Sequence, residues 1–221
     1  MGHPTGSPQI RRMNHRIWED VLSFWLETPA TTGLALTQKI QRWYLGTPQL
    51  DLEIDTRFGD VVERALEGGH EDWTEAPRSS LALVIVLDQF ARNLYRGTRR
   101  AYDGDARALA LALRMLERGD AAGFSLEERL FAMMPLVHAE DVALQDRAVE
   151  LTDQIVAAAA TEELRAVWAN GAARTRYYRS IIGRFGRFPR RNGPLGRNST
   201  PQELAFILEE DAANATKSPA A

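Results

Sequence analysis

Apolar residues recur every three to four positions along most of this chain, which is the spacing of amphipathic helices. Ile17, Val21, Phe24 and Trp25 form the first such stripe, and Pro29 ends the helix that the stripe predicts. Similar stripes predict further helices over residues 36–43, 49–66, 109–116, 144–155 and 161–184.

The segment from Leu81 to Leu87 is uninterrupted apolar sequence, and its composition would also suit a β-strand. The polar stretch from Asp88 to Asn93 follows it directly, and no turn residue separates the two. The combined length therefore favours a buried helix over residues 78–94, at the centre of the fold.

Two of the predicted helices begin with clear capping signals. Ser125 and Glu128 form a capping box, in which each side chain bonds the backbone N–H of the other residue. Thr200 and Glu203 repeat the pattern, and Pro201 occupies the first turn, where no N–H donor is needed. The last helix is therefore expected to begin directly after Thr200.

The order of these elements predicts the fold class. No two alternating segments joined by a hairpin turn appear in the sequence. We expect an all-α fold of about eight or nine helices, stacked as antiparallel pairs in a bundle or short solenoid. The expected organisation is a flexible lead over residues 1–13, a single helical domain over residues 14–212 and a flexible tail over residues 213–221.

Composition excludes several classes of protein. The 221 residues include no cysteine, which rules out disulfides and cysteine-ligated metals and fits a cytoplasmic location. No apolar run approaches the roughly 20 residues that span a membrane, so we expect no membrane association. The formal net charge of −3 lacks the basic excess that is typical of nucleic-acid binders.

The common catalytic and cofactor motifs do not occur. The chain has no phosphate-binding glycine loop, no HExxH zinc motif and no GxSxG nucleophile motif. With four histidines and no cysteine, a metal site with several such ligands is hard to build. We therefore expect neither a metal nor a cofactor.

The strongest candidate for acid–base chemistry is His138. Together with Asp141 and Gln145 it follows the spacing i, i+3, i+7, which predicts one face of a helix, with Glu140 pointing elsewhere. A histidine beside a carboxylate can serve as a general base. The alternative is that His138 only caps a helix or bonds within the core, and that Glu140 pairs with an arginine.

A second polar cluster directly follows the central apolar segment. Asp88 and Arg92 are four residues apart and can pair along a helix, with Asn93 beside them. One interpretation is a pocket floor at which Arg92 binds an anion. The other is a buried ion pair that ties helices together, and the sequence leaves both open.

The segment 185–192 interleaves arginine and phenylalanine with residues that break helices. Arg187, Arg191 and Asn192 are expected on a loop that the phenylalanines anchor. Arginines held in this way suit the recognition of a carboxylate or phosphate. The alternative is a wrapping loop whose arginines cap helix ends, while the acidity of the whole chain disfavours RNA binding.

Several short sequence blocks carry a resemblance to a known family. They cover residues 21–25, 42–43, 57–58, 81–93, 135–140, 145, 185–192 and 195–200. In this order they resemble the bacterial family called domain of unknown function nine-two-four. The resemblance covers roughly residues 17–208 and implies a tetratricopeptide-like stack of helices. It implies no activity, because the family has no assigned biochemical role.

The chain departs from the family pattern at three positions. It has Ala91 where the family pattern typically has proline, and Tyr178 and Arg190 where that pattern typically has histidines. Tyrosine can donate a hydrogen bond but is a poor base near neutral pH, so any chemistry of those histidines is altered here. The polar set that remains is Asp88, Arg92, Asn93, His138, Glu140, Gln145, Arg187, Arg191 and Asn192, with Tyr178 as a donor.

Two hypotheses of function follow. The first is a pocket between the central helix, the His138 segment and the arginine loop that binds a small anionic molecule. In it His138 is the general base, and Arg92 or Arg187 is the anion clamp. The second is a helical scaffold that binds a protein partner without catalysis. A closed polar cavity favours the first hypothesis, and an open groove with exposed apolar residues favours the second.

Overall fold

The protein is all-helical in the computed structural model, which describes the backbone of residues 8–215 and the side chains of residues 17–215. No strand occurs in this range, so the all-α prediction is confirmed. The α-helices are α1 (Pro8–Leu26), α2 (Gly33–Leu45), α3 (Pro48–Leu66), α4 (Pro77–Val84), α5 (Ala91–Leu94), α6 (Asp105–Arg118), α7 (Leu126–Val137), α8 (Val142–Ala157), α9 (Glu162–Phe185) and α10 (Pro201–Ala215). The shorter elements are the π-helical turn η2 (Ile85–Phe90) and the 3-10 turns η1 (Glu71–Thr74), η3 (Arg99–Tyr102), η4 (Asp120–Gly123) and η5 (Pro189–Arg191).

The expected lead and tail fall partly beyond the described range. Residues 1–7 of the lead and residues 216–221 of the tail lie outside the described residues. Of the rest, residues 8–13 belong to α1 and residues 213–215 belong to α10.

Side chains that accept hydrogen bonds start most of the helices. Thr32, Thr47, Asp141 and Thr161 each accept a bond from the backbone N–H three residues further along. Both capping boxes predicted from the sequence are present, one before α7 and one before α10. These helix starts therefore follow from local side-chain chemistry.

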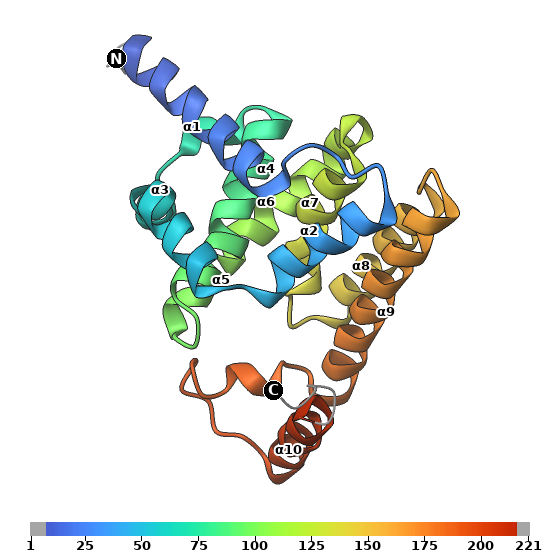
Figure 1. The fold of residues 1–221 in the computed structure, drawn as a ribbon. Helices are drawn as coiled ribbons and strands as arrows, with labels where there is room; N and C mark the ends of the chain where they lie inside the picture. The colour runs from blue at the N-terminus through green and yellow to red at the C-terminus, as the bar shows by residue number, and fades with distance from the viewer. Residues whose placement is uncertain (1–7, 216–221) are drawn as a thin grey trace.

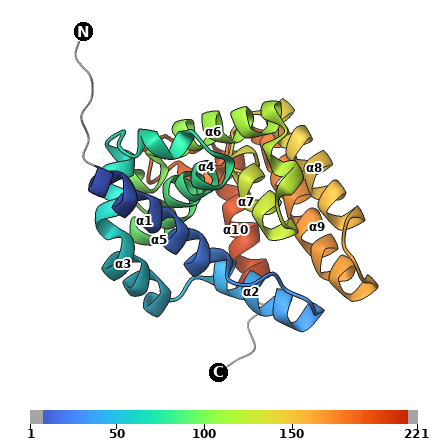
Figure 2. The same cartoon turned by 90° about the horizontal axis from the view of Figure 1, so that it is seen from above.

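One helical run through α4, η2 and α5 forms the centre of the fold, from Pro77 to Leu94 (Figure 2). Every residue from Leu81 to Ala91 is buried, which confirms the predicted central helix. The run widens into the π turn at η2, which the helical periodicity did not predict. Such turns shift the register of the side chains that they carry and are frequent at functional sites.

The other helices pack around this central run (Figure 1). On one side it contacts α1 and α3, and on the other α6 and α7. The helices α8 and α9 lie side by side as an antiparallel pair against α7, and α2 lies against α9. Aromatic rings join these layers, since Trp25 meets Phe90 and Phe131 edge-on at centroid distances of 5.4 and 5.8 Å. This packing places α2, the central run, α7 and α9 around a common space.

The junction between α7 and α8 differs from the prediction. The helix α7 ends at Val137 with His138 as its C-cap, and Asp141 begins α8 by accepting a hydrogen bond of 2.9 Å from the backbone N–H of Leu144. The expectation that His138, Asp141 and Gln145 share one helical face is therefore wrong. The physical reason is that the Asp141 carboxylate competes for backbone N–H groups and favours a helix start over a helix interior.

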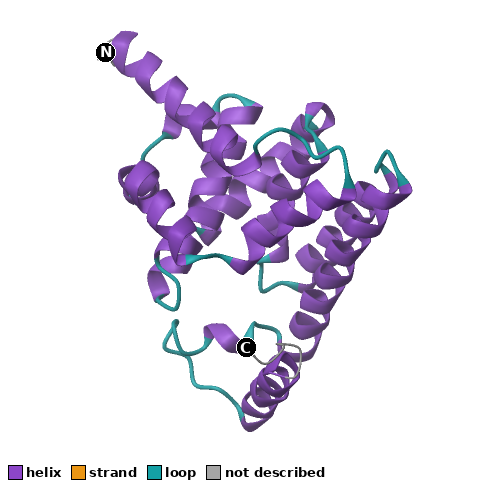
Figure 3. Cartoon of the chain, viewed as in Figure 1, coloured by secondary structure: helices purple, strands orange, loops and turns teal. Residues whose placement is uncertain are grey.

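The C-terminal part wraps below the rest of the molecule (Figure 3). Gly186 ends α9 in the left-handed region at φ 68°, where glycine pays no steric penalty. The chain then runs as a loop, interrupted by η5, until α10 begins. This loop contains the arginine-rich segment that the sequence singled out.

None of the helices in residues 8–215 combines the length and the apolar composition that crossing a lipid bilayer requires.

Candidate functional site

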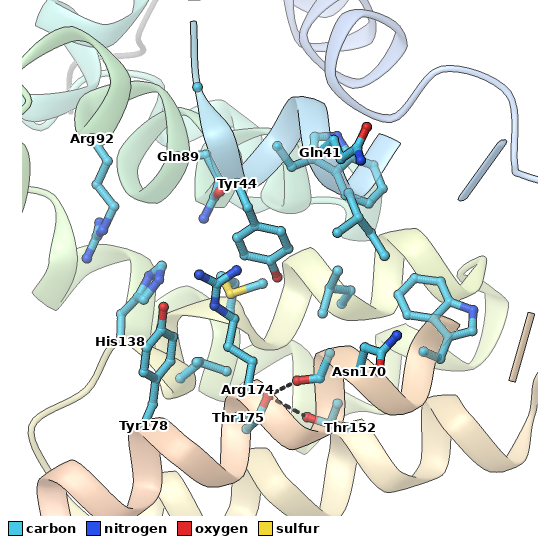
Figure 4. A pocket seen from close by; sticks show the side chains of 18 of the residues that line it. Gln41, Tyr44, Gln89, Arg92, His138, Thr152, Asn170, Arg174, Thr175 and Tyr178 are labelled. Carbon is cyan, nitrogen blue, oxygen red and sulfur yellow. Dashed lines mark hydrogen bonds between the residues drawn. The ribbon is translucent and has the colours of Figure 1, made fainter. Parts of the chain in front are cut away.

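A pocket of about 340 Å³ lies between α2, the central run, the end of α7 and α9 (Figure 4). This volume falls in the range that small-molecule sites occupy. One part is polar and contains Gln89, Arg92, His138, Arg174 and Tyr178. The apolar lining consists of Ile40, Trp43, Leu130, Met134, Val137, Val167 and Trp168.

His138 and Asp88 form a hydrogen-bonded pair at the polar end. The His138 Nδ1 atom lies 2.8 and 3.0 Å from the two carboxylate oxygens. Because an ionised carboxylate only accepts hydrogen bonds, Nδ1 carries the proton and Nε2 keeps a lone pair. Nε2 makes no hydrogen bond within the described chain, and the ring lines the pocket. A carboxylate that orients a histidine in this way is the arrangement of a general base.

Burial and charge together set the protonation of this pair. Burial alone would raise the pKa of the Asp88 carboxyl, but Arg92 and His138 outweigh it and hold that pKa well below its usual range. Gln89 adds a hydrogen bond of 2.6 Å to the same carboxylate. Burial lowers the pKa of His138, and the attraction of Asp88 only partly offsets this effect. The ring is therefore neutral at pH 7.

Arg92 links charged side chains instead of standing free in the pocket. Its guanidinium lies 3.1 Å from Asp88 and 2.8 Å from Asp105. Asp105 also pairs with Arg191 at 3.5 Å, and the ring of Tyr102 lies against both guanidinium groups. Of the two interpretations that the sequence left open for Arg92, the geometry favours the buried ion pair.

Arg174 is a charged pocket residue that the sequence analysis did not single out. Its guanidinium lies over the rings of Tyr44 and Tyr178, at 5.0 and 5.9 Å from their centroids (Figure 4). It has no carboxylate partner among the described residues. Burial raises the pKa of Tyr44 to about 12, so the phenol stays protonated and can donate a hydrogen bond. Together these groups offer one positive charge and hydroxyl donors to an anion.

The sequence contains one weak indication that Arg174 belongs to the site, namely its spacing from Gly171 and Tyr178. Gly171, Arg174 and Tyr178 recur at intervals of three and four along the predicted helix over 161–184, so they share one face. The same helix carries Arg176 and Arg179, which pair with carboxylates outside the pocket. Nothing local distinguishes the pocket arginine from its neighbours.

Glu140 and Gln145 hold the chain together beside the pocket. Glu140 accepts a hydrogen bond of 2.8 Å from the backbone N–H of Phe188 and pairs with Arg197 at 2.6 Å. The fully buried Gln145 donates to two backbone carbonyls of the junction between α7 and α8. The alternative interpretation of Glu140, as the partner of an arginine, describes its position correctly.

The arginine loop is anchored by α10. Arg187 pairs with Glu203 through contacts of 2.7 and 2.9 Å, and it does not line the pocket. Asn192 is buried and donates to Ser199 at 3.0 Å and to Glu203 at 3.3 Å. The structure thus brings Arg187 and Asn192 together with each other, and not with His138.

The remaining predicted positions divide between the pocket and the surface. Asn93 lines the pocket and donates to a backbone carbonyl of the π turn at 2.9 Å. Of the two positions at which the resemblance led us to expect histidine, Tyr178 lies in the pocket, whereas Arg190 pairs with Glu210 and Asp211 of α10. Within the described residues no three histidine, aspartate or glutamate side chains are grouped as metal ligands would be.

Fold and site together define an all-helical protein with a partly apolar pocket beside a buried aspartate–histidine pair. The chain belongs to the family DUF924, described as bacterial protein of unknown function, whose sequence profile matches residues 21–211. The resemblance inferred from the sequence blocks is thereby confirmed.

A solved structure, that of a protein of unknown function from Agrobacterium tumefaciens, is similar to this chain over almost its full length. The two are 32% identical with a TM-score of 0.72, and the match covers 89% of this chain and 99% of the other. No match was found among curated proteins.

Proposed function

We propose that the pocket binds a small organic anion and that His138 acts on the bound molecule as a general base. The observation that carries this proposal is Arg174, a guanidinium that lines the pocket without a carboxylate partner in the described chain. A charge-assisted hydrogen bond from such a group is roughly twice as strong as one between neutral groups. Arg174 takes the anchoring role that the sequence suggested for Arg92 or Arg187.

The acid–base part of the proposal rests on the pair of Asp88 and His138. Asp88 holds the ring in the tautomer with the proton on Nδ1, so Nε2 can take a proton from the ligand or from a water beside it. The carboxylate then stabilises the imidazolium that forms. Catalysis of this kind contributes about 10²- to 10⁴-fold in rate.

Calorimetric titration with a panel of small carboxylates and phosphates tests the binding step. The variant Arg174→Gln removes the charge, and Arg176→Gln is the matched control, because Arg176 lies on the same helix and pairs outside the pocket. We expect at least one anion whose affinity falls about tenfold or more in Arg174→Gln. The control is expected to bind like the wild type. Equal affinities for all three proteins would refute the proposal.

Nitrogen-15 NMR of the histidine rings tests the acid–base step independently of any ligand. The expected spectrum at pH 7 shows His138 as a neutral ring with the proton on Nδ1. In Asp88→Asn the preference for this tautomer weakens, because the charged acceptor is gone. A ring protonated on both nitrogens, or on Nε2 alone, contradicts the assigned role.

The second candidate function is a scaffold that binds a protein partner. The exposed side chains of Leu204 and Leu208 favour it, since they lie one turn apart on α10 with 52% and 69% of their surfaces accessible. The tetratricopeptide-like stacking and the cytoplasmic location remain predictions from the sequence, and both are compatible with a scaffold. Loss of a co-purifying protein in Leu204→Ser/Leu208→Ser, with anion binding unchanged, would support the scaffold.

A further inference from the structure

The charges around the pocket indicate the charge of its ligand. Three arginines line it. Arg92 and Arg96 are matched by carboxylates, with nearest oxygens at 2.8 and 3.1 Å. Arg174 alone adds a charge that no described carboxylate compensates. A single uncompensated charge suits a monoanion, whereas a phosphate monoester carries about −1.5 to −2 at pH 7.

The donors beside Arg174 match the geometry of a carboxylate. An arginine presents two parallel N–H groups that fit the two oxygens of a carboxylate. The rings of Tyr44 and Tyr178 flank the guanidinium, and their hydroxyls make no hydrogen bond within the described chain. A carboxylate at this point would therefore meet a fork of N–H groups and two further O–H donors.

An apolar wall lies next to this polar end. Val167 and Trp168 precede Arg174 by about two turns of α9, a distance of about 10 Å along the helix axis. Ile40 of α2 and Leu130 of α7 complete the wall. A ligand whose carboxylate reaches Arg174 thus has an apolar surface beside it, which favours an apolar body.

Gly171 lies on the pocket side of α9, between the apolar wall and Arg174. It lies in the interior of α9, where glycine is less favourable than alanine because its backbone loses more freedom on folding. Its φ is not positive, and an added Cβ atom would meet no atom within 4 Å. Neither backbone conformation nor close helix packing therefore requires glycine here. The residue instead leaves room in the pocket between the apolar wall and Arg174.

From this arrangement we infer that the ligand is an amphipathic monocarboxylate, with its carboxylate on Arg174 and its apolar body over Gly171. This inference rests on the proposed function, because it names the class of ligand for the same pocket. It places the carboxylate at the polar end of the pocket, which Arg174 shares with His138.

A chain-length series tests the inference on the wild-type protein. Straight-chain monocarboxylates from acetate to decanoate are titrated by calorimetry, each beside the neutral amide and the phosphate monoester of the same chain. We expect affinity to rise about fourfold for each methylene, as burial of a CH₂ group provides, until the pocket is full. The amide is expected to bind at least tenfold more weakly than the carboxylate, and the phosphate no more tightly.

The variant Gly171→Leu tests the position of the apolar body. The new side chain occupies the space over residue 171 and favours helix, so the protein is expected to fold. Acetate is expected to bind as in the wild type, and the gain with chain length is expected to stop several carbons earlier. Gly171→Ala, which adds one methyl group, is expected to shift the limit by less.

The outcomes separate this inference from the proposed function. If anion binding depends on Arg174 but ignores chain length, or prefers phosphate, the ligand class is wrong and the proposed function stands. If long chains bind equally well to Gly171→Leu, the body lies elsewhere and the inference is wrong. If no anion binds the wild type, or Arg174→Gln binds as the wild type does, both fail.

Discussion

Removal of the charge on Asp88 is the most informative test of the site's architecture. The carboxylate is fully buried, accepts hydrogen bonds from His138 and Gln89, and forms an ion pair with Arg92. Asp88→Asn preserves the size of the side chain but replaces one oxygen with an NH₂ group. That group meets an N–H group in either orientation, because one carboxylate oxygen accepts a hydrogen bond from Gln89 and the other lies 3.1 Å from the Arg92 guanidinium.

The expected cost follows from these contacts. Breaking a buried ion pair by removing one partner costs roughly 3–5 kcal/mol. Arg92 retains Asp105 as a second partner, which places the loss at the lower end, near 3 kcal/mol. For a domain of this size, each kcal/mol corresponds to about 2–4 °C in Tm, so we expect a fall of roughly 6–12 °C.

Urea and thermal unfolding at pH 7 measure this loss. Asp141→Asn is the matched control, because it makes the same chemical change at an exposed helix cap where asparagine serves as well as aspartate. A double-mutant cycle with His138→Gln isolates the direct interaction of the pair. Its coupling energy is expected to fall between about 1 and 3 kcal/mol.

Two results would refute this reasoning. If Asp88→Asn stays within about 0.5 kcal/mol of the wild type, the carboxylate is not a buried, charged partner. If the cycle gives no coupling, Asp88 and His138 do not stabilise one another, and the base would lack its orienting group.

Three further predictions concern pH and local stability. Gly171→Ala is expected to raise Tm by about 2–4 °C, because helix propensity improves by about 1 kcal/mol without a clash; an unchanged or lower Tm would contradict the open space above the residue. The folded-state pKa values of His138 and Asp88 are both depressed, so the unfolded chain binds protons more readily, and the free energy of unfolding should fall as pH drops below about 6.5 and again below about 4. Because burial also lowers the pKa of His70, His138→Gln should reduce the upper step in urea titrations without abolishing it. Glu203→Gln should speed tryptic cleavage within residues 186–200 of the native protein, because the loop loses its anchor, and a cleavage rate equal to that of the wild type would argue against that anchor.

Most of the fold could be predicted from the sequence, because helix formation here depends on residues that are close together in the sequence. The buried run over residues 78–94 and the capping box at Ser125 both depend on residues within one or two turns. The prediction failed at Asp141, where one residue type suits either a helix face or a helix cap. The π turn at Asp88 was also missed, because it changes hydrogen bonding without changing the apolar pattern.

The candidate site was only partly predictable. Asp88 and His138 were singled out separately; His138 lines the polar end of the pocket, and the buried Asp88 is hydrogen-bonded to it. Their pairing across 50 residues was not predicted, because contact between distant segments depends on how helices pack. Arg187 was expected in the pocket for its position on an aromatic loop, but a carboxylate of α10 neutralises it.

The sequence by itself determined that the chain folds as helices, where several of them begin, and to which family it belongs. Only the tertiary structure decided which of many arginines faces a pocket without a partner. Arg174 and Arg176 are alike in type and lie two residues apart, yet one meets two tyrosine rings and the other an aspartate. The reason is physical: the charge that remains free for a ligand depends on where the acids of other helices lie, and packing alone sets those distances.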